Sequence, residues 1–92
     1  MAKKQSLKSG SLYKIAKSST AKLVAVKKDL NDLFSDSLYQ IGVSDVFMFL
    51  QEYPVSDLLG MNVKRIKLMT GNGTIGYIFF VGNRVKFTEI KI

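Results

Sequence analysis

The chain contains 92 residues, of which 47% are hydrophobic, and it carries a formal net charge of +7. This length predicts one domain, because a second would be too small to bury a stabilising core. Cysteine and histidine are both absent. Disulfides, thiolate metal sites and the commonest catalytic base are therefore excluded.

The charged residues fall into three blocks along the chain. Residues 1–28 contain eight lysines and no acidic residue, whereas residues 29–63 contain six acidic residues and no lysine or arginine. Residues 64–92 are basic again, with Glu89 as their single acid. If the ends of the chain pair in space, the domain has a basic flank and an acidic flank, which suits docking to charged partners.

Residues 1–10 are expected to form a flexible basic arm with Lys3, Lys4 and Lys8, because they contain little that could be buried. The lysine-rich start lacks the apolar stretch of a signal peptide. The longest apolar runs are too short to span a bilayer. The sequence therefore predicts a soluble protein without a membrane partner.

Two short strands and a polar turn are the first elements expected after the arm. Residues 12–15 and 21–27 are rich in apolar and β-branched side chains around a Lys-Ser-Ser-Thr turn, a pattern typical of a hairpin. Residues 29–38 then place apolar side chains at helical spacing behind Asp29, a residue suited to cap a helix. This segment is interpreted as a helix of two to three turns or, alternatively, as a long loop pinned by its apolar residues.

The middle of the chain predicts a central strand. Residues 39–43 are expected to be extended, and residues 45–53 contain the run VFMFL, which is typical of a strand covered on both faces. Pro54 is expected to end this strand. Residues 56–60 have the composition of a single helical turn closed by a glycine.

The last third gives the clearest local signal. Residues 63–69 and 74–80 flank Thr-Gly-Asn-Gly, and Asn-Gly favours the tight turn of an antiparallel hairpin. Alternation in the first of these strands predicts that Ile66 and Leu68 are buried while the charged residues between them are exposed. A final strand is expected over residues 84–90.

Together these elements predict a mainly β fold. The expected architecture is a small barrel of five to six antiparallel strands with one short helical insert, in which residues 11–92 form a single domain.

Three segments resemble short, phage-encoded barrels of the Src-homology-3-like type. They are LKSGSLYKI, VFMFLQEYP and VKRIKLMTGNGTIGYIFF. The likeness covers roughly residues 8–90 and implies the fold of that family. It also implies a virion part or a host-directed accessory, located in the virion or in the cytoplasm of the host cell. Recognition of proline-rich peptides is not expected, because the chain has no tryptophan.

The sequence offers no pattern for catalysis. Asp29, Asp32 and Asp36 have helical spacing but lack the residue pattern of a calcium loop, so they are interpreted as a solvated face. Gly71 and Gly73 lack the lysine and the helix of a phosphate-binding loop, so they are assigned to a turn. The protein is therefore predicted not to be an enzyme and to need no cofactor, metal or small-molecule substrate.

Five basic residues near the C-terminal end are candidates for binding nucleic acid or for steering a charged partner: Lys64, Arg65, Lys67, Arg84 and Lys86. The alternative is that they keep the outer sheet face hydrated. The strand at residues 75–81 is apolar on both faces, and Tyr77, Phe79 and Phe80 are predicted to anchor a protein partner or a second copy, unless the acidic insert covers them.

The most probable function on these grounds is a noncatalytic protein-binding or assembly module, as a structural or accessory component of a phage virion. One alternative is a barrel whose basic strands bind nucleic acid. A second is a phage-encoded inhibitor of a host enzyme that uses the acidic residues 29–57 to imitate nucleic acid.

Overall fold

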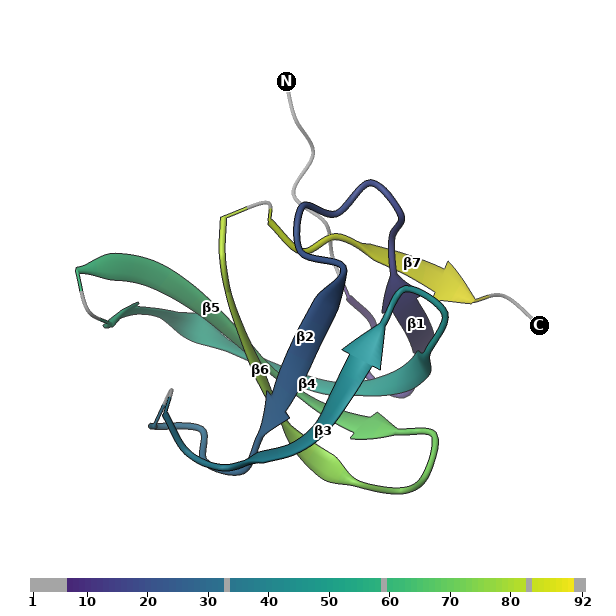
Figure 1. Ribbon diagram of the computed structural model, residues 1–92, viewed down its shortest axis with the longest axis horizontal. Coiled ribbons are helices and arrows are strands. Elements are labelled where there is room, and N and C mark those ends of the chain that lie inside the picture. Colours follow the sequence, from purple (N-terminus) through teal and green to yellow (C-terminus); the bar gives the residue numbers. More distant parts are fainter. Residues whose placement is uncertain (1–6, 33, 59, 83, 91–92) are drawn as a thin grey trace.

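Seven strands form one antiparallel sheet in the computed structural model, which describes residues 7–32, 34–58, 60–82 and 84–90 (Figure 1). The strands are β1 (Leu12–Ile15), β2 (Leu23–Lys27), β3 (Ser37–Gly42), β4 (Val46–Leu58), β5 (Met61–Thr70), β6 (Ile75–Val81) and β7 (Phe87–Ile90). Their order across the sheet is β3-β2-β6-β5-β4-β1-β7. The predicted mainly β class is confirmed, but there are seven strands rather than five to six.

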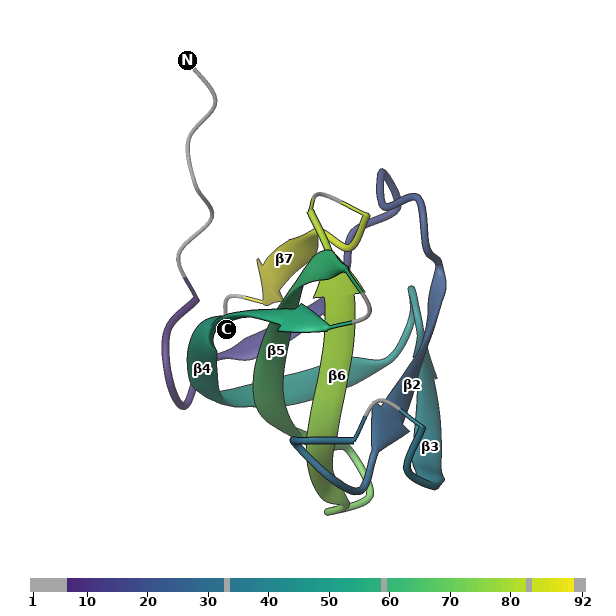
Figure 2. The same ribbon diagram turned by 90° about the vertical axis from the view of Figure 1, so that its left-hand side faces the viewer.

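The sheet curls into a half-barrel whose inner face holds the core (Figure 2). Alternate positions of each strand point inward, so β1 buries Tyr13 and Ile15 and β5 buries Ile66 and Leu68. Burying each such side chain contributes roughly 1.5–3 kcal/mol. The predicted alternation of buried and charged residues in β5 is confirmed, since Arg65 and Lys67 are partly exposed.

The ends of the described chain meet in the sheet, because β1 pairs antiparallel with both β7 and β4. The predicted hairpin between residues 12–15 and 21–27 is wrong. β1 does not pair with β2. Instead, β2 pairs with β3 and, through Lys27 and Tyr77, with β6. The local sequence pattern predicted both strands correctly. However, the strands that pair with each of them lie elsewhere in the chain.

The predicted helical insert at residues 29–38 is also wrong, because the described residues of this segment form turns and no helix. Asp29 Oδ1 accepts a hydrogen bond from the Asn31 amide at 2.9 Å, and Asp32 Oδ1 accepts one from the Phe34 amide at 2.9 Å. An aspartate that bonds the amide two residues ahead forms a turn rather than a helix cap. The alternative of a pinned loop is therefore the correct one.

Pro54 does not end β4, contrary to the prediction. The strand continues to Leu58, and its pairing with β5 shifts register between Tyr53 and Ser56. A bulge of this kind leaves a residue out of the ladder, so a proline without an amide hydrogen is tolerated there. The helical turn predicted at residues 56–60 is replaced by the end of β4 and by Gly60, whose φ of 76° suits a turn; Leu59 lies outside the described residues.

The run Val46–Leu50 is covered on one face only. Phe47 and Phe49 are buried, whereas Val46 is 39% exposed. The expectation of a strand covered on both faces is therefore wrong, and the outer side of β4 is available for contact.

The hairpin predicted around residues 70–73 is confirmed. The Thr70 amide donates to the Thr74 carbonyl at 2.8 Å, and Gly73 has a φ of 87°. The final strand begins later than predicted, at Phe87, because residues 84–86 bond to the segment before β2.

Residues 7–10, the described part of the predicted arm, lie against β4. The Gly10 amide donates to the Phe49 carbonyl at 2.8 Å, and Leu7 packs against the core. The exposed Lys8 is within this part, while Lys3 and Lys4 lie outside the described residues. In the described ranges, no helix is long and apolar enough to cross a membrane.

Candidate functional site

A continuous row of apolar side chains crosses the outer face of the sheet. Five residues, one each from β6, β5, β4, β1 and β7, are directly opposed in successive strand pairs: Ile75, Met69, Met48, Leu12 and Ile90. Directly opposed residues of antiparallel strands project from the same face. The positions next to them along the strands, such as Phe47, Leu68 and Tyr13, point into the core. These five residues are called the apolar row below.

The apolar row faces solvent and has a cationic border. Ile75 is 50% exposed, and the other four members are partly exposed. Two residues along the strands from the row, on the same face, lie Lys14 of β1 and Lys67 of β5. No Asp or Glu occupies such a bordering position in the described strands. The surface therefore matches an apolar partner surface with a negative border.

The three aromatic residues that were predicted to anchor a partner do not share one face. Tyr77 and Phe79 occupy outward positions of β6, whereas Phe80 packs against the core. The ring centroids of Phe80 and Phe87 are 5.6 Å apart in an edge-on contact. The structure thus brings Tyr77 and Phe79 together and separates Phe80 from them.

Arg65 fastens the loop at residues 29–36 over the outer face beside Tyr77. Its Nη1 donates to the Leu30 carbonyl at 3.2 Å, and its Nη2 donates to Ser56 Oγ at 2.6 Å. Its guanidinium carbon also lies 6.0 Å from the centroid of the Tyr53 ring. Arg65 was predicted to steer a partner or contact phosphate, but in the structure its fork is engaged within the chain.

The same contacts cover part of the apolar surface of β6. The rings of Tyr53 and Tyr77 are 6.1 Å apart, next to Arg65. Loss of hydration raises the pKa of the Tyr53 hydroxyl above its usual value; Tyr77 adds to the rise, while Arg65 opposes it. Tyr53 of β4 thus packs on Tyr77 beside Arg65, and the apolar row remains open.

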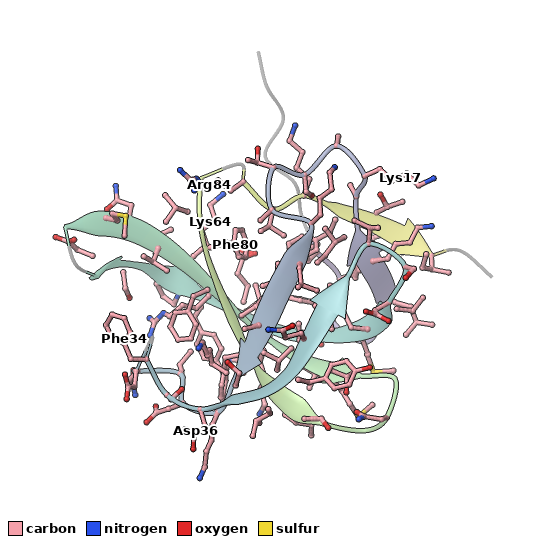
Figure 3. All side chains as sticks on the ribbon, in the orientation of Figure 1. Lys17, Phe34, Asp36, Lys64, Phe80 and Arg84 are labelled. Atoms are coloured by element: carbon pink, nitrogen blue, oxygen red, sulfur yellow. The ribbon has the colours of Figure 1, made fainter. Side chains whose placement is uncertain are left out.

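The other predicted basic residues are divided between two places. Lys67 lies on the outer face opposite Tyr77, whereas Lys64 lies opposite Phe80 near the end of β6 (Figure 3). Lys86 follows in the segment that bonds to residues 16–21. The five residues therefore do not form one patch.

The acidic residues of the insert do not stand alone. Lys27 Nζ donates to the Ser35 carbonyl at 3.4 Å and to Ser37 Oγ at 3.1 Å, and the Lys28 amide donates to the Asp36 carbonyl at 3.0 Å. Among the described residues, no group of three or more acidic side chains could hold a metal ion. Lys27 and Lys28 thus lie next to the aspartates of the insert, and imitation of nucleic acid by residues 29–57 stays a hypothesis.

Sequence reasoning missed most of the apolar row. Leu12, Met48, Met69 and Ile90 are isolated outward positions on four strands, and each is an ordinary surface residue by itself. Only the register between strands puts them in line. The alternation of each strand was the available signal, but it does not fix the register.

A scan against protein-family models finds no matching family, and neither the curated proteins nor the solved structures give a significant match. The resemblance to Src-homology-3-like phage barrels therefore stays a prediction, whereas the strand arrangement itself shows a small, barrel-like all-β fold.

Proposed function

We propose that the protein is a noncatalytic binding module that assembles with another protein through the apolar row. The observation that carries this proposal is the continuity of the row, with apolar side chains in register from β6 to β7 on an open face. Exposed apolar surface costs about 25 cal/mol per Å² relative to its burial. A contiguous exposed patch of this kind marks an interaction surface.

The partner fitted by this surface is a protein with an apolar centre and a border of carboxylates. Lys14 and Lys67 would pair with that border and orient the complex. A second copy of this chain fits less well. Symmetric pairing would bring the lysines of one copy near those of the other, and two molecules that each carry a net charge of +7 repel each other.

The biological setting is proposed from the sequence resemblance alone. Short phage-encoded barrels serve as virion parts or accessories, and an assembly surface on one face suits such a role. We therefore place the protein as a structural or accessory component of a phage virion.

A photo-activated crosslinker at position 48, in the cells that make the protein, tests the proposal. We expect one discrete crosslinked protein whose contact peptide is rich in Asp and Glu. The same crosslinker at Gln40, an exposed residue of β3 that is not part of the row, serves as the control. The substitution Met48→Lys should then weaken binding of the identified partner about 30-fold, as truncation of an interface anchor does, whereas Gln40→Lys should not.

Two results would contradict the proposal. Crosslinks from position 48 to a second copy, with the mass of a dimer in light scattering, would replace the distinct partner with self-assembly. Equal crosslinking from positions 48 and 40 would show that the apolar row is not the contact surface.

A further inference from the structure

Two segments that are far apart in the sequence are held together at one end of the half-barrel. The Ala16 amide donates to the Lys86 carbonyl at 2.8 Å, and the Ala21 amide donates to the Arg84 carbonyl at 3.0 Å. The buried Ser19 Oγ accepts a hydrogen bond from the Lys86 amide at 2.8 Å and donates to its carbonyl at 3.0 Å. The backbone of residues 16–22 and 84–86 therefore forms one fixed surface.

This surface gathers positive charge from both ends of the sequence. It carries Lys17, Lys22, Arg84 and Lys86, and Lys64 of β5, opposite Phe80, lies toward the same end of the molecule; these five residues are called the basic end. In the view of Figure 3, Arg84 and Lys64 project at one side of this end, Lys17 projects at its other side, and Asp36 lies at the opposite end of the molecule. Neither segment contains an Asp or Glu. Lys22 Nζ donates to the carbonyl oxygens of Lys17 and Ser19, which are neutral acceptors, so its charge is not cancelled.

The chemistry of the basic end distinguishes it from a protein-binding surface. Protein interfaces place aromatic and other large apolar side chains at their centre. None of the exposed large hydrophobic residues lies within residues 16–22 or 84–86, where Val85 is buried. Stable attachment to a membrane surface adds apolar side chains that insert between the lipids to the attraction for anionic headgroups. Cations together with the exposed hydroxyls of Ser18 and Thr20 are instead the groups that contact nucleic-acid phosphates.

The same composition favours a duplex over a single strand. Single-stranded nucleic acid is bound by stacking its bases on exposed aromatic side chains. The two exposed aromatic residues of the described chain, Phe34 of the insert and Tyr39 of β3, lie outside the basic end (Figure 3). Phe80, opposite Lys64, packs against the core. Because the basic end offers no exposed aromatic ring on which a base could stack, it can contact only the phosphate backbone, which a duplex presents at regular spacing.

We propose that the basic end binds the phosphate backbone of double-stranded DNA without reading its sequence. This activity goes beyond the proposed assembly function, because it uses a different surface and a different class of partner. Both can operate together, since the apolar row and the basic end have no residue in common and Ile75 lies at the opposite end of β6 from Phe80, the partner of Lys64.

The salt dependence of binding to a short mixed-sequence DNA duplex tests this proposal with the full chain. Five phosphate contacts predict that log K falls with log salt with a slope of about −4.5, since each contact contributes about 0.9. The affinity should therefore fall about 500-fold between about 50 and 200 mM salt. The double variant Lys17→Ala/Arg84→Ala should reduce the slope to about −2.7.

The matched control is Lys28→Ala/Lys67→Ala, which removes the same charge elsewhere and should keep the slope of the unmodified protein. Equal losses in the two double variants would overturn the assignment to the basic end. A slope near zero, or equal binding of polyglutamate, would overturn binding to phosphates. Tighter binding of a single strand with the same sequence would overturn the preference for duplex DNA.

Discussion

At Gly76, β6 passes so close to β2 that no side chain fits between them. A Cβ atom at this position would lie 2.5 Å from Val26 Cγ1 and 2.8 Å from the Lys27 carbonyl oxygen. Real Cβ atoms do not approach other atoms so closely, and the backbone oxygen cannot rotate away. The glycine therefore sets the crossing of the only described pairing that joins β2 to β6, between Lys27 and Tyr77.

We expect Gly76→Ala to lower the free energy of unfolding by about 1–3 kcal/mol, because the added methyl forces β2 away from β6. Urea denaturation followed by circular dichroism measures the change. Gly71→Ala is the control. The nearest atom to its Cβ would be the Val46 carbonyl oxygen at 3.8 Å, an ordinary contact. Equal losses of stability in both variants would show that the loss comes from replacing any glycine of this hairpin and not from the close approach of β6 to β2.

Among the connecting elements, the loop at residues 29–36 is joined to β5 by Arg65. Arg65 reaches it through the Leu30 carbonyl and also holds the β4 bulge through Ser56 Oγ. The buried Arg65 Nε finds no acceptor among the described residues. The guanidinium group of Arg65 thus joins the loop at residues 29–36 to the β4 bulge, while its Nε donor stays without an acceptor among the described residues.

We expect Arg65→Lys to loosen this loop although the charge is kept, because an ammonium group cannot bond both segments with the geometry of the fork. Cleavage by a protease that cuts before aspartate should become about tenfold faster at Asp29, Asp32 and Asp36, which corresponds to about 1.4 kcal/mol in local opening. Lys67→Arg, on the same face, is the control. Unchanged cleavage in Arg65→Lys would show that the loop is held by other contacts.

Strands and turns that depend on neighbouring residues could be predicted from the sequence. The pairing of strands that are far apart in the chain could not. Asn72–Gly73 fixes a hairpin by backbone geometry alone, so β5 and β6 were predicted correctly. Asp29 was ambiguous, because the same carboxylate can cap a helix or close a turn. Pro54 was predicted to end the strand, but it is tolerated at a bulge, where its missing amide hydrogen is not needed for pairing.

The surfaces were harder to predict than the strands. Phe79 and Phe80 are identical side chains, but Phe80 packs against the core because it lies on the same face of β6 as the buried Ile78. Arg65 and Lys64 are adjacent in sequence, yet one is engaged by the insert and the other lies at the basic end. Neighbours in a strand point to opposite faces, so a charge block in the sequence does not become one patch.

At the scale of the whole molecule, the described residues form one end with several cations and an insert that is nearly neutral. The insert carries three aspartates beside Lys27, Lys28 and Arg65, so its charges nearly balance. The basic end has no such balance. Self-repulsion within this end opposes the folded state at low ionic strength.

We therefore expect the melting temperature to rise by roughly 2–4 °C between low and physiological salt, as screening returns about 0.5 kcal/mol. Differential scanning calorimetry at several sodium chloride concentrations measures this. Lys17→Ala/Arg84→Ala should show a smaller rise than Lys28→Ala/Lys67→Ala. An identical rise in both variants would mean that repulsion is distributed over the entire surface.

The pairing of β1 with β7 has a consequence for how the chain folds. Leu12 lies opposite Ile90, so this ladder closes almost the entire described chain into one loop. Closing so long a loop costs entropy before any contact compensates for it. The successive hairpins of β4, β5 and β6 can form from near neighbours, and the docking of the two outermost segments comes afterwards. The high contact order of such a topology makes folding slow, and until that docking is complete the edge of β4 stays open to pairing with other chains.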